Sequence, residues 1–305
     1  MMTTDRRSFL KDLGLLTGAA AFGSIIPLEA FSAGKKEFFK ISLAEWSLHK
    51  TLFAKKLNNL DFPLKAKKDF GIDIVEYVSV FFENKEKDPA YLKELKTRTK
   101  NEGIQNHLIM VDREGNLGDT NDAARLKAVE NHYKWVDAAK YLGCKTIRVN
   151  AGGKGTAEQV KAAAIDGLGK LTEYGKKQKI NVIVENHGGY SSDGAWLADV
   201  IKQVNSSYCG TLPDFGNFAL GGGKEYDKYK GVEEMMPYAK GVSAKSMNFA
   251  PNGDESDIDY YRMFEIIKAA KWSGLVGIEY SGKGPEDEGI LKTKALLEKI
   301  LQRYK

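Results

Sequence analysis

Short β-rich segments alternate eight times with helical segments between residue 39 and the end of the chain. This alternation constrains the fold more than any other feature of the 305 residues. The β-rich segments are built from Ile, Val, Leu or Tyr and are bounded by turn signals such as Phe70-Gly71 and Leu142-Gly143. They cover residues 39–47, 72–80, 104–111, 144–150, 180–186, 208–214, 240–246 and 274–280.

The intervening segments show helical periodicity, which is clearest in residues 119–142. Apolar residues recur there at helical spacing from Ala124 to Ala139, polar residues 119–122 offer N-terminal caps, and Gly143 is a typical helix stop. A last helix is expected over residues 287–304. Strand–helix units repeated eight times place the strands parallel and close them into a barrel. We therefore expect an α/β protein, a single-domain (β/α)8 TIM barrel.

A doubly wound parallel sheet is the alternative fold. The first predicted strand is not followed by the GxGxxG sequence of the usual nucleotide-binding version of that fold. A chain of this length is also ordinary for an α/β barrel that forms one domain.

The N-terminal residues are typical of an export signal. Arg6-Arg7 precedes an apolar, small-residue run from Leu13 to Pro27, which indicates a twin-arginine (Tat) signal. The run is shorter than the roughly 20 residues that a membrane-spanning helix needs, so no membrane span is expected. We assign residues 1–33 to a Tat-type signal peptide and 34–305 to the barrel, and expect a periplasmic or otherwise exported protein.

Charge argues against a nucleic-acid partner. The 46 basic and 41 acidic residues leave a net charge of +5, spread along the chain without a basic block. Nucleic-acid binders usually cluster their basic residues on one face.

Ionisable residues gather near the carboxyl ends of the predicted strands, where barrel enzymes carry their active sites. Alternation along each strand predicts which side chains face the barrel axis. For the first strand it leaves Trp46 and Glu45 as alternatives. The other predicted inward residues are Glu76, His107, Arg148, Asn150, Glu185, His187, Asp214, Ser243, Lys245 and Glu279.

Three of these residues, Glu185, Asp214 and Glu279, would repel one another unless a cation lies between them. Carboxylate ligands suit Mn²⁺ or Mg²⁺, and an adjoining imidazole would favour Mn²⁺, Co²⁺ or Zn²⁺. The alternative is a structural charge network in which Lys245 and Arg148 neutralise the carboxylates.

The histidines leave several roles open. His187 is a candidate metal ligand, substrate contact or hydrogen-bonded rim residue. His132, on the long helix 119–142, is expected at the surface.

Four segments resemble the xylose-isomerase-like barrel superfamily, which includes sugar phosphate isomerases and epimerases, ketose 3-epimerases, inosose dehydratases and the endonuclease IV branch. They are Gly71–Glu76, Val182–Gly189, Leu212–Phe218 and Gly277–Gly282. The resemblance implies a divalent metal, most often Mn²⁺, held by Glu185, Asp214 and Glu279. The usual histidine ligand of the seventh strand is replaced here by Ser243.

The resemblance also implies a reaction. Glu185 and Glu279 would exchange a proton at the carbon beside a metal-bound carbonyl, and Lys245 is the third predicted catalytic residue. Lys245 and Arg148 would bind substrate oxygens, and Trp46 would stack on a sugar face. The remaining predicted substrate contacts are Glu76, His107, Asn150 and His187.

Three functions follow as hypotheses. The first is a metal-dependent sugar isomerase or epimerase that acts on a small carbohydrate. The second is a lyase that acts on 3-oxo-glycosides, and the third is a non-catalytic sugar-binding barrel. The chain has only four histidines, too few for the three-metal cluster of the endonuclease branch. A homo-oligomer is possible in each case.

Overall fold

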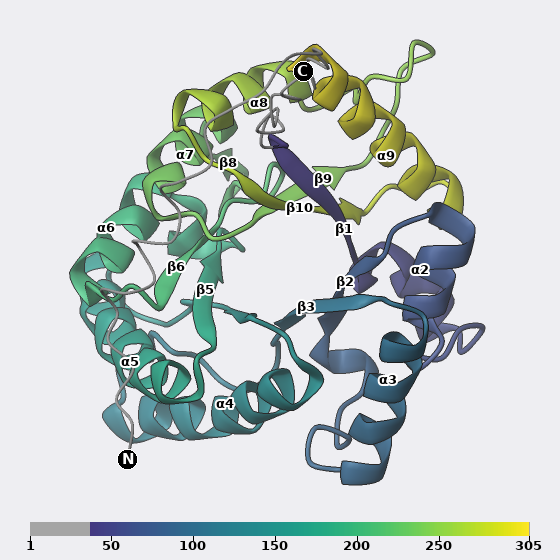
Figure 1. The fold of residues 1–305 in the computed structure, drawn as a ribbon. Coiled ribbons are helices and arrows are strands. Elements are labelled where there is room, and N and C mark those ends of the chain that lie inside the picture. Colours follow the sequence, from purple (N-terminus) through teal and green to yellow (C-terminus); the bar gives the residue numbers. More distant parts are fainter. Residues whose placement is uncertain (1–36, 305) are drawn as a thin grey trace, which may run out of the picture. The chain divides into compact units, whose positions relative to one another are not determined.

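Eight parallel strands form one sheet in the computed structural model, which describes residues 37–304. Neighbouring strands follow the order β6-β5-β4-β3-β2-β1-β10-β9, and helices surround the sheet on its outer side (Figure 1). The strands are β1 (Phe39–Ala44), β2 (Ile74–Val78), β3 (Gln105–Met110), β4 (Thr146–Val149), β5 (Asn181–Glu185), β6 (Cys209–Leu212), β9 (Val242–Ser246) and β10 (Gly274–Tyr280). The expected α/β barrel is confirmed.

The barrel closes between β6 and β9 through a sparse seam. Two isolated bridges, Thr211 to Ala239 and Asp214 to Ser243, replace the ladders that join the other neighbouring strands. Across the seam, the Ser243 amide donates to the Pro213 carbonyl at 2.9 Å and the Phe215 amide donates to the Ser243 carbonyl at 3.1 Å. The seam therefore lies beside two residues of the predicted site.

The described residues belong to one compact unit, Glu37–Lys305. The predicted signal peptide, residues 1–33, and its boundary lie outside the described residues. None of the helices described between residues 37 and 304 combines the length and apolar character needed to cross a membrane.

Side-chain caps and a glycine stop fix the ends of α4 (Asp122–Leu142) and the start of α5 (Ala157–Gln178). The Asn121 side chain caps α4 by accepting from the Ala124 amide, and Gly143 ends this helix in the left-handed conformation. Thr156 and Gln159 form a capping box at the start of α5. The helices are α1 (His49–Phe53), α2 (Phe62–Phe70), α3 (Pro89–Asn101), α4 (Asp122–Leu142), α5 (Ala157–Gln178), α6 (Gly194–Val204), α7 (Lys228–Met235), α8 (Tyr260–Ala269) and α9 (Glu286–Arg303).

Short elements complete the loops that follow the strands. The strands β7 (Ala219–Gly221) and β8 (Lys224–Glu225) form a small antiparallel pair after β6. The 3-10 helices are η1 (Glu45–Leu48), η2 (Ser79–Phe81), η3 (Gly189–Ser192) and η4 (Met236–Tyr238).

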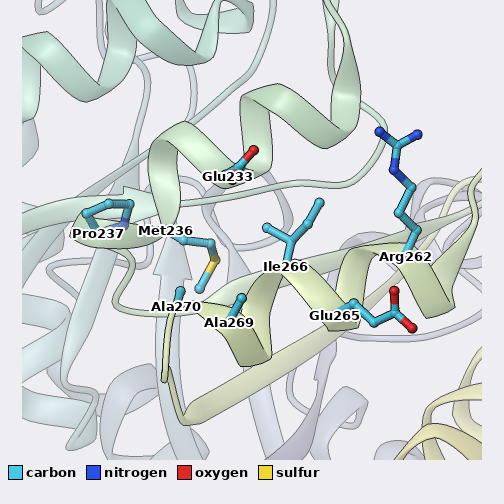
Figure 2. A pocket seen from close by; sticks show the side chains of 8 residues that line it. All are labelled: Glu233, Met236, Pro237, Arg262, Glu265, Ile266, Ala269 and Ala270. Carbon is cyan, nitrogen blue, oxygen red and sulfur yellow. The ribbon is translucent and has the colours of Figure 1, made fainter.

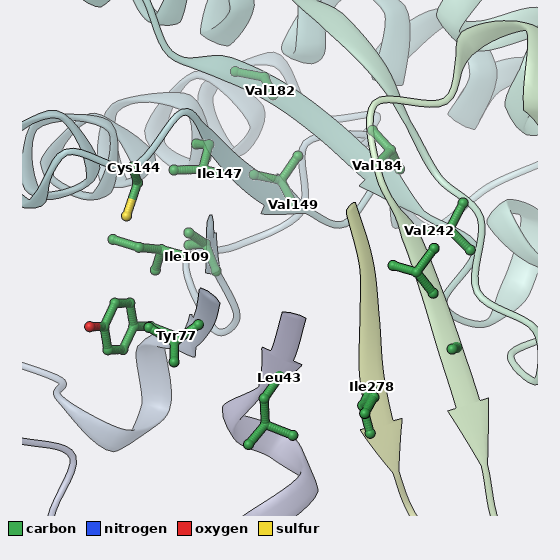
Figure 3. Packing of buried hydrophobic residues seen from close by; sticks show 14 of the residues in the cluster. Leu43, Tyr77, Ile109, Cys144, Ile147, Val149, Val182, Val184, Val242 and Ile278 are labelled. Atoms are coloured by element: carbon green, nitrogen blue, oxygen red, sulfur yellow. The ribbon is translucent and has the colours of Figure 1, made fainter. Parts of the chain in front are cut away.

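Two apolar layers hold the barrel together. The larger layer packs the outward side chains of the strands against the helices, as Figure 3 shows for Leu43, Ile147, Val184 and Ile278 among others. The smaller layer fills the interior with Ala44, Val78, Leu108, Met110, Ile183 and Leu212. The remaining interior positions, toward the carboxyl ends of the strands, are polar and charged.

Candidate functional site

Three buried carboxylates meet at the carboxyl end of the barrel. Glu185 ends β5, Asp214 follows β6, and Glu279 lies near the end of β10. One oxygen atom from each lies within 4.8 Å of the corresponding oxygens of the other two. The alternation of the strands thus brings together the three predicted metal ligands.

The loop after β6 fixes the position of Asp214. The amides of Gly216 and Asn217 donate to Asp214 Oδ1 at 2.8 and 2.9 Å. Asn186 Oδ1 accepts from the Asp214 amide at 2.8 Å. The Ser243 hydroxyl donates to Asp214 Oδ2 at 2.6 Å, so Ser243 contacts this carboxylate across the seam.

Two side-chain cations contact the three carboxylates. Lys245 forms a close ion pair with Glu279, and its Nζ lies 3.6 Å from Asp214 Oδ2. Arg148 Nε lies 2.8 Å from Glu185 Oε2. A Cβ at Gly216 would lie 2.8 Å from Lys245 Cγ, so the glycine leaves room for the lysine chain to reach Glu279.

Burial and these cations act on the carboxylates in opposite directions. Burial raises the pKa of Glu185 to about 8, although Arg148 opposes the shift. Burial also raises the pKa of Asp214, against the effect of Lys245. For Glu279, burial also raises the pKa, but Lys245, Arg148 and His187 together outweigh it, so the pKa is lowered. Lys245 therefore favours an ionised Glu279, whereas Glu185 lies in an environment that favours its neutral form.

A cavity of about 270 Å³ adjoins the carboxylates. Among the predicted residues, Trp46, Arg148, His187, Lys245 and Glu279 line it. Glu185 and Asp214 are not among its lining residues, so Glu279 is the member of the triad that a ligand in the cavity would meet first. The other lining residues are Val78, Met110, Asp112, Asn217, Met247 and Ser281.

The structure distinguishes the two alternatives at the end of β1. Trp46 lines the cavity, with its ring stacked on His49 at a centroid distance of 4.8 Å. Glu45 is buried elsewhere, where it accepts hydrogen bonds from the Asn59 side chain and the Val78 amide. The turn η1 separates the directions of these consecutive side chains.

Two predicted substrate contacts, Glu76 and His107, do not line the cavity. Glu76 accepts a hydrogen bond from Ser42 at 2.6 Å, and burial raises its pKa to about 7. His107 lies at a register shift, where Val75 pairs with Asn106 and Glu76 pairs with Leu108. The shift interrupts the alternation in β3, so Leu108 and Met110 take the interior positions.

Asn150 also lies outside the cavity lining, and its Nδ2 donates to Asp112 Oδ1 at 2.8 Å. Arg148 binds the same oxygen at 2.8 Å. Asp112 is thus a site residue that sequence reasoning missed. Its signal was available, because Asp112 continues the parity of Leu108 and Met110 beyond the end of β3.

Asn217 was missed as well, although it lies in one of the family-like segments. Its Nδ2 donates to Glu185 Oε1 at 2.9 Å, and it also lines the cavity.

The prediction that His132 lies at the surface is wrong. His132 is buried in α4, with Nδ1 2.7 Å from the Ala128 carbonyl oxygen.

The carboxylates suit a divalent cation. Glu185 Oε2 is buried without a well-formed hydrogen bond, despite the nearby Arg148 Nε. If ionised, Glu185, Asp214, Glu279 and Asp112 carry four negative charges against the two positive charges of Arg148 and Lys245. A divalent cation would neutralise the remaining two, and three carboxylate oxygens are appropriate ligands for it.

A larger pocket, of about 430 Å³, lies in the helical layer (Figure 2). Met236 and Pro237 precede β9, and Ala269 and Ala270 precede β10, so this pocket lies toward the amino ends of those strands. It is therefore separate from the triad.

The comparisons with known proteins agree with the barrel fold. The family model "Xylose isomerase-like TIM barrel" matches residues 64–300. No curated protein matches the chain by sequence. One similar solved structure is the IOLI protein with a zinc atom bound, at 15% identity and a TM-score of 0.66, covering 87% of this chain and 99% of that one.

Two epimerases have similar structures. An L-ribulose 3-epimerase matches at 13% identity and a TM-score of 0.66, covering 87% of this chain and 96% of that one. The 3-keto-D-glucoside 4-epimerase of E. coli matches at 16% identity and a TM-score of 0.62, covering 86% and 99%. Identities this low show the shared fold alone, whereas the family match spans most of the sequence. The chain therefore belongs to the xylose isomerase-like TIM barrel family.

Proposed function

We propose that the protein is a divalent-metal-dependent carbohydrate isomerase or epimerase that removes a proton from the carbon beside a carbonyl. The convergence of Glu185, Asp214 and Glu279 beside a small polar cavity carries this proposal. The epimerases with similar folds support the same substrate class.

Glu185, Asp214 and Glu279 would hold the metal, with Mn²⁺ as the first choice and Mg²⁺, Co²⁺ or Zn²⁺ as alternatives. A bound divalent cation would polarise the substrate carbonyl and stabilise the oxyanion that forms on proton loss. Ser243 occupies the position of the family's usual histidine and instead donates a hydrogen bond to Asp214.

Glu279 is the proposed base. It lines the cavity, and its ion pair with Lys245 favours the ionised form that accepts a proton. Glu185 is the proposed second proton-transfer group. It contacts Asn217 and Arg148, which line the cavity. In an epimerisation, the proton leaves the substrate carbon for one carboxylate and a proton returns to the opposite face of that carbon.

The cavity also offers groups that position a sugar. Trp46 presents an aromatic ring suited to a sugar face, and Arg148 and Lys245 are hydrogen-bond donors for substrate oxygens. His187, exposed at the rim, is a further proposed contact.

The function can be tested with ketohexoses in heavy water containing Mn²⁺. We expect deuterium at the carbon beside the carbonyl and an epimeric or isomeric product, both detected by NMR. The same experiment with a 3-oxo-glycoside tests the lyase hypothesis, because elimination also releases the aglycone. No exchange with any sugar or metal in the panel would contradict the proposed reaction.

The charge-network alternative also has structural support, because Lys245 and Arg148 contact all three carboxylates. Elemental analysis after Mn²⁺ reconstitution separates the two. We expect about one divalent ion per chain, and Asp214→Asn should lose most of it. Asp199→Asn, a half-exposed position on α6, is the matched control. A wild-type protein without metal would favour the charge network and a non-catalytic sugar-binding barrel.

We also propose export through the Tat pathway, based on Arg6-Arg7 and the following apolar run. Replacing both arginines by lysine should retain the precursor in the cytoplasm. The exported protein should begin between about residues 30 and 36, as N-terminal sequencing would show. Unchanged export of the double variant would contradict the assignment.

A further inference from the structure

A second cavity, of about 490 Å³, lies at the carboxyl ends of β4 and β5. Its lining comes from the loop after β4, the start of α5, the loop and helix after β5, and the β7 strand. Tyr190, Trp196 and Leu220 supply its large apolar side chains, whereas glycines and alanines from the two loops leave the space between them open.

The second cavity neighbours the 270 Å³ cavity lined by Trp46 and Glu279, here called the catalytic cavity, because nearby residues of the same loops line the two. His187 lines the catalytic cavity, and the next two residues, Gly188 and Gly189, line the second one. Asn217 and Leu220 are similarly divided between the two cavities. The loops at the rim of the catalytic cavity thus form a wall of its neighbour.

This neighbouring wall is tied together by hydrogen bonds. The Ser192 hydroxyl donates to the Asn217 carbonyl at 2.9 Å and accepts from the Gly188 amide at 2.9 Å. These bonds hold the loop after β5 against the loop after β6. The boundary between the two cavities is therefore fixed by hydrogen bonds.

The aromatic side chains present apolar faces, because their polar atoms are already bonded. The Tyr190 hydroxyl donates to the Gly155 carbonyl at 2.9 Å, and Trp196 Nε1 donates to the Ala157 carbonyl at 3.1 Å. The two rings stack on each other, with centroids 6.0 Å apart and an interplanar angle of 28°. Such a wall is suited to a flat apolar group.

The charges of the lining disfavour a phosphate. Among the described residues that line the second cavity there is no Lys or Arg, and Asp193 is the only ionisable carboxylate. That carboxylate caps α6 by accepting from the Trp196 amide. A phosphate would meet a negative charge here without a cation to bind it.

We propose that the second cavity holds the aglycone of a glycoside whose sugar ring carries a carbonyl group. The aglycone is a flat aryl or similarly apolar group, and the sugar occupies the catalytic cavity. This inference rests on the proposed function, since it takes the catalytic cavity as the sugar site. The catalytic cavity alone is below the roughly 300–1,000 Å³ of common ligand pockets. The neighbouring cavity supplies room for a substrate larger than a single sugar.

The test compares phenyl and methyl glucosides, in both anomeric forms, by isothermal titration calorimetry with the Mn²⁺-reconstituted protein. At least one phenyl glucoside should bind about tenfold more tightly than its methyl counterpart, because the phenyl ring is buried. Tyr190→Ala should reduce this preference about three- to tenfold, whereas Tyr190→Phe, which keeps the ring, should retain it.

A second pair of variants avoids dependence on Tyr190. Leu220→Asp places a charge in the apolar cavity at a position that is 36% exposed, so the protein should still fold. It should remove most of the phenyl preference. Leu291→Asp, an exposed leucine on α9, is the matched control and should leave the preference unchanged.

An aromatic cluster on another part of the rim provides the competing site. Phe53 is 54% exposed and packs edge-on against Trp46. If Phe53→Ala, rather than Tyr190→Ala, removes the phenyl preference, the aglycone lies there and the proposal is overturned. Equal affinities for phenyl and methyl glucosides, or no binding of either, would also overturn it.

Binding and turnover fail separately in this design. A protein that binds phenyl glucosides through Tyr190 and Leu220 but catalyses no proton exchange would contradict the proposed reaction and keep the aglycone site. Proton exchange without any preference for phenyl glucosides would support the proposed reaction and contradict the aglycone site.

Discussion

The two sides of the same strands differ in what holds them in place. On β10, Ile278 points into the apolar layer beneath the helices, whereas the next residue, Glu279, points into the barrel and binds Lys245. On β5, Val184 and Glu185 are divided in the same way. The outer side is held by close packing of apolar side chains. The inner side has a smaller apolar layer and, toward the carboxyl ends of the strands, is held by ion pairs and hydrogen bonds.

This difference shows that alternate residues of one strand can have different roles. One residue packs in the apolar layer, and the next places a charged group in the candidate site. The outer layer gains free energy from each buried methylene group. The interior buries charges whose desolvation opposes folding, and raised pKa values at Glu76 and Glu185 record this opposition. Neighbouring residues should therefore fail in different ways when they are replaced.

The largest expected effect is on catalysis. Glu279→Gln keeps the shape of the side chain but removes the proposed base, so deuterium exchange into substrate should slow by roughly 10²–10⁴. Glu185→Gln should also slow it strongly. Metal content must be measured in both variants, because either residue can also hold the cation. Glu298→Gln, half-exposed on α9, is the control. Wild-type exchange in both site variants would assign the base to Lys245 or His187.

Ile278→Ala should show the opposite behaviour. Ile278 is fully buried, so truncation should lower the free energy of unfolding by about 2–5 kcal/mol. Urea denaturation followed by circular dichroism measures this loss. Exchange activity per folded molecule should stay within a few-fold of wild type. A large activity loss with unchanged stability would break the division between the two sides.

Glu76 tests the stability of the interior through pH. Its pKa is about 7 in the folded protein against 4.5 for a free side chain. The folded state therefore holds this proton more tightly, and the resulting stability is present below pH 4.5 and is lost as pH rises through 7. The loss is on the order of 2–4 kcal/mol.

Glu76→Gln keeps an acceptor for Ser42 but cannot ionise. From pH 5 to pH 8, the variant should therefore become more stable relative to wild type. Denaturant unfolding of both proteins at the two pH values gives the comparison. Parallel pH profiles would show that Glu76 is already ionised in the folded protein at low pH.

The smallest expected effect concerns Ser243. Its hydroxyl donates to Asp214, so Ser243→Ala leaves a buried carboxylate with one donor fewer. The free energy of unfolding should fall by about 1–2 kcal/mol, as measured by urea denaturation. Ser246→Ala, which removes a buried hydroxyl on the outer side, is the comparison variant. A stabilised Ser243→Ala would show that this hydroxyl is not needed to satisfy Asp214.

The sequence predicted the barrel and much of its site because both depend on regular alternation. Along β5, β9 and β10 the ladders are unbroken, and Glu185, Lys245 and Glu279 lie where parity places them. The prediction for His107 differs because a register shift in β3 is invisible to a period-two pattern.

Loops limited the remaining predictions. Trp46 and Glu45 could not be told apart, since the direction of each depends on a 3-10 turn after the strand ends. The second cavity was not foreseen at all. It is assembled from loops after three strands, and the packing of Tyr190 on Trp196 follows no spacing rule in the sequence.

The sparse seam between β6 and β9 connects the candidate metal site with the closure of the barrel. Asp214 and Ser243 form one of its two bridges. Residues at the candidate metal position therefore also join β6 to β9 and close the barrel. Transient opening of the barrel should begin at this join, where few backbone bonds must break. A cation or substrate that ties Asp214 to Glu279 would then slow solvent exchange of the Ser243 and Phe215 amides. These two amide protons thus become internal reporters of whether the mouth of the barrel is filled.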